Sequence, residues 1–241
     1  MSRITFENYA RRTRSTMSYA EISGRYEVQD AAQRHMVADV GQKLALRAED
    51  RLLEIGCSVG NLLIPLSFVV GEATGIDHPD VLALFNARFT DGSIRTIPGN
   101  FLDVDPSGPY DKILVYSVLS CLGSRDELFG FIDKACDLLA PGGRVLFGDL
   151  PNVDRKRRFT ESAHGRAFLE NWKRDFADRP GVDPDTVLEP DPDVMHFSDA
   201  LVLDVLAHAR KRGFESFVLP QPPELPFGNT REDILIVQSE D

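Results

Sequence analysis

The segment formed by residues 51–61, RLLEIGCSVGN, restricts the possible folds of this chain more than any other. Residues 52–55 are a short apolar run containing one glutamate, which predicts a buried parallel strand. The glycine-rich residues 56–60 lead into the apolar stretch 62–70, which predicts a helix. Glycines let backbone approach a ligand closely, and free amides at a helix start favour polar or anionic groups. The segment therefore predicts a strand, a ligand-binding turn and a helix.

A carboxylate follows the next predicted strand. Residues 72–76 read as that strand, and Asp77 ends it, 21 residues after Gly56. In Rossmann-like sites, a carboxylate at this spacing accepts hydrogen bonds from ribose hydroxyls. The sequence thus predicts a nucleoside site with Asp77 as its ribose ligand.

The turn and four later tracts carry a family resemblance. Glu54-x-Gly56-x-Ser58-x-Gly60 resembles the ExGxGxG motif of class I S-adenosylmethionine-dependent methyltransferases, with Ser58 where the middle glycine is often found. The family's later landmarks are matched in the same order by GIDHP (75–79), GNFLD (99–103), YDKILVYSVL (110–119) and LLAPGGRVLFGD (138–149). The resemblance covers residues 51–149 and extends to the closing hairpin. It implies an α/β, Rossmann-like, seven-stranded mixed sheet of order 3-2-1-4-5-7-6, with strand 7 antiparallel and helices on both faces.

The resemblance also implies S-adenosyl-L-methionine as cofactor and a set of residues that bind it. Asn100 stands where family members usually carry an aspartate that accepts from the adenine amino group, and its amide oxygen can still accept one bond. The expected cofactor-binding residues are Glu54, Gly56, Cys57, Ser58, Gly60, Asn61, Asp77, His78, Asn100, Phe101, Leu102, Tyr116 and Ser117.

Composition bounds the class of protein. The chain has 241 residues, 42% of them hydrophobic and 27% charged, which suits one domain with a full core. Its net charge of −11 disfavours nucleic acid and anionic membranes as partners. Three cysteines without CxxC spacing favour a reducing compartment, so we expect a cytoplasmic protein.

We expect a single methyltransferase domain over residues 1–241. Its parts are a helical N-terminal lid (1–48), a cofactor-binding half (51–149), an insertion forming an acceptor lid (150–198), and a closing helix and β-hairpin (199–241). The remaining apolar patterns predict helices at 26–46, 79–89, 126–139 and 200–211, and strands at 94–97, 113–117, 144–148, 216–219 and 234–238.

Two segments permit a structural and a functional interpretation. The helix predicted at 26–46 either packs on the sheet edge or covers the cofactor, in which case Tyr19 or Tyr26 lines the cover. The basic run 155–158 either is a solvated charged face or holds an anionic group of the acceptor. In the second interpretation the acceptor-binding residues are Arg155, Arg157 and Arg158, together with Tyr19 and Tyr26.

The expected chemistry is in-line transfer of a methyl group from a sulfonium to a small-molecule acceptor. The protein then supplies alignment and, for a hydroxyl acceptor, a base. His196 is the first candidate base because histidine titrates near neutrality, Asp149 is the second, and His164 follows. Metal-dependent catechol-type enzymes place an aspartate where Ser117 stands, so no metal is expected. The tract GDLPNVDRKRRF (148–159) resembles methyltransferases of bacterial surface-polysaccharide clusters and favours O-methylation of a sugar or sugar nucleotide.

Two other functions are compatible with the motifs. Residues 56–60 also match the G-x-S-x-G elbow of serine hydrolases, with Ser58, Asp149 and His196 or His208 in the required order. The chain could alternatively bind S-adenosylmethionine without catalysing a reaction.

Overall fold

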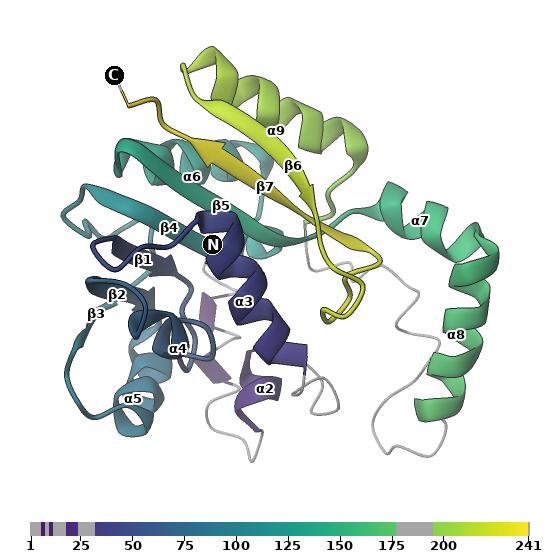
Figure 1. Ribbon diagram of the computed structural model, residues 1–241, viewed down its shortest axis with the longest axis horizontal. Helices are drawn as coiled ribbons and strands as arrows, with labels where there is room; N and C mark the ends of the chain where they lie inside the picture. Colours follow the sequence, from purple (N-terminus) through teal and green to yellow (C-terminus); the bar gives the residue numbers. More distant parts are fainter. Residues whose placement is uncertain (1–5, 8–9, 12–17, 24–31, 177–194, 241) are drawn as a thin grey trace.

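A seven-stranded sheet forms the centre of the computed structural model, which describes residues 6–7, 10–11, 18–23, 32–176 and 195–240 (Figure 1). Its order is β3-β2-β1-β4-β5-β7-β6, and β7 pairs antiparallel with β5 and β6 while the other pairs are parallel. The predicted order and the antiparallel seventh strand are confirmed. The strands are β1 (Arg51–Ile55), β2 (Glu72–Asp77), β3 (Ile94–Pro98), β4 (Tyr110–Tyr116), β5 (Leu139–Pro151), β6 (Glu215–Pro220) and β7 (Arg231–Val237).

Helices cover both faces of the sheet, because the central strands are apolar on both sides (Figure 1). Leu53 and Ile55 of β1 pack with α6 and α9, whereas Leu52 of the same strand packs with α3, α4 and α5. The helices are α2 (Tyr19–Ile22), α3 (Gln33–Leu44), α4 (Leu63–Ser67), α5 (Pro79–Arg88), the 3₁₀ turn η2 (Leu119–Cys121), α6 (Arg125–Asp137), α7 (Val153–Glu161), α8 (Ala163–Phe176) and α9 (Asp199–Lys211).

Two element bounds differ clearly from the sequence prediction. The helix expected at 62–70 is only α4, because the amide of Gly71 donates to the carbonyl of Asp50 and already starts the return into β2. Strand β5 is longer than the expected 144–148, and its pairing with β7 shifts register between Phe147 and Leu150. Asp149 lies in this irregularity with a φ of 63°, a left-handed conformation that aspartate tolerates better than most residues.

Helix α3 rests on the sheet through an apolar stripe and one buried ion pair. Met36, Val40 and Leu44 are buried, as the periodicity predicted. Lys43 Nζ lies 2.7 Å from the carboxylate of Asp233, whose side chain is fully buried in β7. Burial raises the pKa of Asp233, and the charge of Lys43 opposes that rise. Residues 24–31, including Tyr26, lie outside the described part of the chain.

The polypeptide leaves the sheet after β5 and forms α7 and α8, which extend away from the body (Figure 1). The side chain of Asn152 caps α7 by accepting from the amides of Asp154 and Arg155. As expected, these residues interrupt the alternation of strands and helices. No helix in the described ranges has the length and apolar character needed to cross a membrane.

The Lys43–Asp233 pair gives the first prediction. Lys43→Met should lower the free energy of unfolding by about 3 kcal/mol, because the Asp233 carboxylate would remain buried without its cation. Urea denaturation followed by circular dichroism measures this change. Adding Asp233→Asn should recover part of the loss, and Arg125→Gln, which breaks an exposed pair with Asp204, should change stability by less than about 1 kcal/mol. A Lys43→Met protein as stable as wild type would contradict the assignment.

Candidate active site

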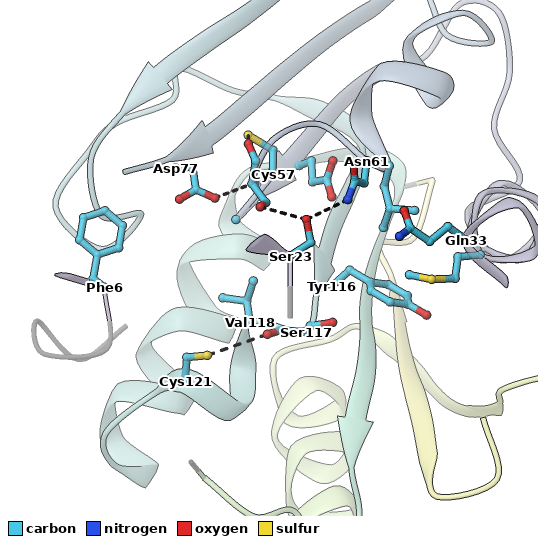
Figure 2. Close-up of a pocket in the computed structure, with 15 residues that line it drawn as sticks. Phe6, Ser23, Gln33, Cys57, Asn61, Asp77, Tyr116, Ser117, Val118 and Cys121 are labelled. Atoms are coloured by element: carbon cyan, nitrogen blue, oxygen red, sulfur yellow. Dashed lines mark hydrogen bonds between the residues drawn. The ribbon is translucent and has the colours of Figure 1, made fainter. Parts of the chain in front are cut away.

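An open cavity lies at the carboxyl ends of β1, β2 and β4, where open α/β sheets bind ligands (Figure 2). Its empty volume is about 740 Å³, a figure that includes open solvent at the mouth. Eight residues of its wall were expected from the sequence: Glu54, Gly56, Cys57, Ser58, Asn61, Asp77, Tyr116 and Ser117.

The end of β2 binds the backbone of the glycine-rich turn (56–60) through hydrogen bonds. The amides of Gly56 and Cys57 both donate to the carbonyl of Ile76, at 2.8 and 3.1 Å. A Cβ atom on Gly56 would lie 2.4 Å from Val118 Cγ2 on the cavity wall, and Gly56 has a φ of 80°. Glycine is therefore required here both by the backbone and by the close approach of η2. Gly60, with a φ of 83°, instead packs against Phe85 of α5, which gives it a structural role.

Asp77 belongs to both the turn and the cavity. Its Oδ2 accepts from the amide of Ser58 at 2.7 Å, and its Oδ1 accepts from the amide of His78 at 2.6 Å. Burial raises the pKa of Asp77, and these two bonds counteract that rise. Each carboxylate oxygen has a second lone pair, so Asp77 can still accept bonds from two ribose hydroxyls.

Glu54 adds a buried carboxylate to the same cavity. Within the described ranges its Oε2 has no hydrogen-bond partner, although it is buried at the end of β1. Burial raises the pKa of Glu54 well above its ordinary value, and the charge of Asp77 raises it further. A buried anion without a cation is costly, so this wall favours a ligand that carries positive charge. The sulfonium and ammonium groups of S-adenosylmethionine fit that requirement.

A smaller cavity adjoins the first and shares Phe6, Gly56, Asp77 and Val118 with it. Asn100, Phe101 and Phe131 line it, and the rings of Phe101 and Phe131 lie 4.7 Å apart. The Asn100 loop is fixed by Lys134 Nζ, which donates to the carbonyls of Phe101, Leu102 and Val104. This apolar slot lies beside Asp77, the carboxylate expected to bind ribose, and it suits an adenine ring. Leu102 itself packs against the apolar core, and its amide donates to Asn100 Oδ1.

The N-terminal segment lies on the glycine-rich turn. Asn61 Nδ2 donates to the carbonyl of Tyr19 at 3.0 Å and to Ser23 Oγ at 2.9 Å, and Ser23 Oγ lies 3.2 Å from Ser58 Oγ (Figure 2). The guanidinium of Arg88 lies over the ring of Tyr19, 4.5 Å from its centre. The Tyr19 side chain is 47% exposed and contacts the Arg88 guanidinium. Ser23 lines the cavity, and Tyr19 does not.

Several wall residues were not predicted from the sequence. They come from the N-terminal segment, from α3, from the start of α4 and from η2: Phe6, Ser23, Gln33, Met36, Leu62, Val118 and Cys121. Met36 belongs to the predicted apolar stripe, and Gln33 precedes it by one helical turn, so the helix pattern carried part of this signal. His78, expected at the cofactor, caps α5 through Nδ1 and packs its ring against Phe6 at 4.9 Å.

Two residues with left-handed backbone meet at the carboxyl ends of β4 and β5. Ser117, with a φ of 61°, donates its Oγ proton to Asp149 Oδ2 at 2.5 Å. Arg231 Nη1 lies 3.3 Å from the same carboxylate oxygen. Ser117 lines the cavity, so this pair brings a buried carboxylate next to the ligand site.

The candidate histidines lie in different environments. His196 lies between Met195, whose amide donates to the carbonyl of Ser120 in η2, and Phe197, which bridges Asn152. His164 is exposed on α8, and His208 of α9 contacts Asp133 of α6 at 2.6 Å; neither histidine lines the cavity. In the described ranges Ser58 Oγ bonds to Ser23 and to no histidine, so the hydrolase triad is not assembled.

Two of the three arginines expected at the acceptor are used within the protein. Arg157 pairs with Asp154 at 3.1 Å, and Arg158 pairs with Asp199 at 2.5 Å, both on the surface. The Arg157 pair lies within α7, whereas the Arg158 pair joins α7 to the start of α9. An acceptor role for these two guanidiniums stays a prediction. Arg155 points elsewhere, with Nη2 at 3.4 Å from the carbonyl of Gly228.

Comparison with known proteins identifies the family. A family model described as a methyltransferase domain matches residues 29–201. The chain belongs to this family. The predicted S-adenosylmethionine-dependent methyltransferase and its cofactor are thereby confirmed, and the serine-hydrolase and non-catalytic alternatives are set aside.

Solved structures share the fold at low sequence identity. The N-methyltransferase NodS of Bradyrhizobium japonicum WM9, in complex with S-adenosyl-L-homocysteine, is 16% identical with a TM-score of 0.64, over 98% of this chain and 99% of that one. Phosphoethanolamine N-methyltransferase 1 of Haemonchus contortus is 12% identical with a TM-score of 0.69, over 98% of this chain and 49% of that one. Magnesium protoporphyrin IX methyltransferase of Synechocystis PCC 6803 is 15% identical with a TM-score of 0.59, over 97% and 94%. These likenesses concern the fold.

One curated relative is similar in sequence. The probable nonribosomal peptide synthetase CymA of Salinispora arenicola is 28% identical over 147 residues, which are 58% of this chain. The match spans only 2% of the length of that synthetase. The activity of the whole synthetase therefore carries no conclusion for this chain.

The second prediction concerns Asp77, the carboxylate expected to bind the ribose hydroxyls. Asp77→Asn should weaken S-adenosylmethionine binding by about 2–3 kcal/mol, because a charged acceptor becomes a neutral one. Asp77→Ala should weaken it at least as much, since it also removes the acceptor of the Ser58 and His78 amides. Isothermal titration calorimetry on folded variants measures both. Wild-type affinity in Asp77→Asn would show that the carboxylate does not bind ribose.

The third prediction concerns Glu54, where one substitution should raise the stability of the protein and lower its affinity for the cofactor. The pKa of Glu54 in the folded protein is raised above its ordinary value of 4.5. In the pH window between 4.5 and this raised pKa, the native protein therefore binds more protons than the unfolded protein. Stability contributed by the protonated form is therefore lost as pH rises through that window. Glu54→Gln should remove this loss and stabilise the ligand-free protein at pH 8 by about 1–2 kcal/mol, with a smaller gain at pH 5.

The same substitution should weaken S-adenosylmethionine binding about tenfold, because the cationic ligand loses its countercharge. Urea denaturation at both pH values and calorimetry at pH 8 test the two halves. A variant less stable than wild type at pH 8 and unchanged in affinity would refute the assigned role.

Proposed function

We propose that this methyltransferase transfers a methyl group to a hydroxyl oxygen of a small-molecule acceptor, and that Asp149 accepts the proton of that hydroxyl. The observation that carries the proposal is the Ser117–Asp149 hydrogen bond at 2.5 Å, made at the edge of the cofactor cavity. Asp149 is buried, and Ser117 connects it to the cavity wall.

Bound S-adenosylmethionine supplies an activated methyl group on a sulfonium. Glu54, Asp77 and the glycine-rich turn are the residues expected to hold it. The contribution of the chain is then alignment of the acceptor and removal of one proton. Asp149 Oδ2 can receive that proton through the Ser117 hydroxyl, which can donate and accept at the same time. Arg231 Nη1 lies 3.3 Å from the same carboxylate oxygen and orients it from the side of β7.

The backbone around this pair supports a functional role. Ser117 and Asp149 both adopt positive φ, with values of 61° and 63°, at adjacent strand ends. Such conformations are costly for residues with a Cβ and persist where the surrounding structure enforces them, often at functional sites. Here the surrounding bonds are those of the Asp149 amide to Asp233 Oδ1 and of the Ser117 amide to the Gly148 carbonyl.

For the acceptor we propose a sugar or sugar nucleotide, with α7 and α8 as its cover; residues 177–194 of the expected lid lie outside the described part of the chain. The support is the resemblance of tract 148–159 to enzymes of surface-polysaccharide clusters and the position of α7 directly after the strand that carries Asp149. Two of the structural neighbours are named for different acceptors, magnesium protoporphyrin IX and phosphoethanolamine, and so favour no single class. S-adenosylhomocysteine release with sugar nucleotides, phenols, amines and carboxylates tests the proposal, and turnover with amines alone would overturn it.

Asp149→Asn gives the fourth prediction. Asparagine tolerates the left-handed backbone and preserves the size of the side chain, but it cannot take a proton at neutral pH. With the best acceptor of the panel, kcat should fall about 100-fold or more, while S-adenosylmethionine affinity stays within a factor of two. His196→Gln is the matched comparison. Loss of turnover in His196→Gln, with Asp149→Asn unaffected, would assign the base to His196.

A further inference from the structure

Gln33 contributes a buried, unpartnered amide to the wall of the large cavity. It is the first residue of α3, and its Nε2 has no hydrogen-bond acceptor in the described ranges. A buried N–H group without an acceptor is unfavourable, so this amide is suited to contact with a ligand. Figure 2 shows Gln33 at the opposite end of the drawn site from Asp77, the expected ribose ligand.

The other side-chain amide of the wall is already occupied. Asn61 Nδ2 donates to the carbonyl of Tyr19 at 3.0 Å and to Ser23 Oγ at 2.9 Å, which uses both of its protons. Of the two side-chain amides in the described wall, Gln33 is therefore the one whose protons remain for a ligand.

The charged groups that line this cavity all have the same sign. Glu54 and Asp77 are carboxylates, and none of the described wall residues is a lysine, an arginine or a histidine. Arg34 and His35 follow Gln33 in the sequence, but their side chains are exposed and do not line the cavity. A negatively charged group of a ligand must therefore be bound here by neutral donors.

The start of α3 is such a neutral site for an anion. The helix has 12 residues, its first turn holds no acidic residue, and Ala32 before it provides no side-chain cap. The first amides of a helix lack acceptors within the helix and attract negative charge. Gln33 and Met36 both line the cavity, so the first turn of α3 lies at its wall.

The two adjoining cavities define the direction in which the cofactor lies. The small cavity suits adenine and Asp77 is expected to bind ribose, so the amino-acid end extends into the large cavity, where Glu54 lies. The ammonium and the carboxylate of that end share one carbon atom. A site that binds the ammonium at Glu54 therefore needs a donor for the carboxylate in the same part of the cavity.

We propose that Gln33 is a selectivity residue of this methyltransferase, whose Nε2 donates to the carboxylate at the amino-acid end of S-adenosylmethionine. Glu54 and Gln33 then bind the two charges of that end with groups of opposite polarity. A cation in place of Gln33 would also pair with Glu54 and weaken its attraction for the ligand, whereas the neutral amide does not. The inference rests on the cofactor of the family, and not on the identity of the acceptor or of the base.

Ligands that differ in one group test this assignment. S-adenosylmethionine and S-adenosylhomocysteine carry the carboxylate, whereas decarboxylated S-adenosylmethionine keeps the sulfonium and the amine but lacks it. In isothermal titration calorimetry, Gln33→Leu should bind the first two at least about tenfold more weakly than wild type, and the decarboxylated ligand within about a factor of two of wild type. Gln42→Leu, the same change at an exposed position of α3, is the matched control and should bind all three ligands as wild type does.

A second variant changes the sign of the interaction. Gln33→Glu should repel the carboxylate of S-adenosylmethionine and attract the decarboxylated ligand, whose amino end carries only positive charge. The preference for S-adenosylmethionine over its decarboxylated form should therefore fall further than in Gln33→Leu. Circular dichroism verifies that each variant is folded.

Two outcomes would contradict the assignment. Equal losses of affinity for the carboxylated and decarboxylated ligands in Gln33→Leu would show that Gln33 only shapes the cavity. Unchanged affinity for all three ligands, with or without a raised acceptor KM, would show that Gln33 does not bind the cofactor. Neither outcome bears on hydroxyl methylation, which the acceptor panel and Asp149→Asn test separately.

Discussion

Three successive amides of the glycine-rich turn are held by the last two residues of β2. The Ile76 carbonyl receives the amides of Gly56 and Cys57, and the Asp77 carboxylate receives that of Ser58. Parallel pairing of β1 with β2, in a register that aligns Ile55 with Ile76, is what brings these groups together. These bonds within the protein fix the shape of the turn, which reduces the ordering that ligand binding has to supply. Tyr116 and Ser117 join the same edge because β4 pairs with the other side of β1.

Buried carboxylates cluster near this edge, and the protein compensates each of them to a different degree. Asp233 has Lys43 as its cation, and Asp149 has Arg231 and the Ser117 hydroxyl. Glu54 has no cation in the described ranges, and burial raises its pKa. The uncompensated group is the one in the wall of the cofactor cavity. Stability is thus lowered at the position where a cationic ligand restores it, a common trade-off at binding sites.

The central part of the fold could be predicted from the sequence because each signal there was local. Leu52, Leu53 and Ile55 showed a strand buried on both faces, and glycines at 56 and 60 showed the turn. The order of the sheet came from the family resemblance, since periodicity does not specify which strands pair. Strand β5 was predicted too short, because its continuation through Asp149 depends on a bond from its amide to Asp233, which is 84 positions away.

The unpredicted parts of the site depend on contacts between distant segments. Phe6 and Ser23 reach the cavity only because the N-terminal segment folds over the turn, and no local pattern specifies that position. The basic residues 155–158 differ in their surroundings because they have different neighbours in the folded protein. Asp199 neutralises Arg158 from another helix, whereas Arg231 repels Lys156 from another strand. A run of like residues in sequence thus became two chemically different groups.

The contacts that hold α2 on the turn have a kinetic consequence. Near solvent these are the Asn61 bonds to Tyr19 and Ser23 and the stacking of Arg88 on Tyr19. Beneath them, Ile22 is buried against Val59 and Val81. Helix α2 has only four residues, so its local opening requires far less free energy than unfolding of the sheet. The by-product of methyl transfer can therefore leave through this gate while the glycine-rich turn stays intact.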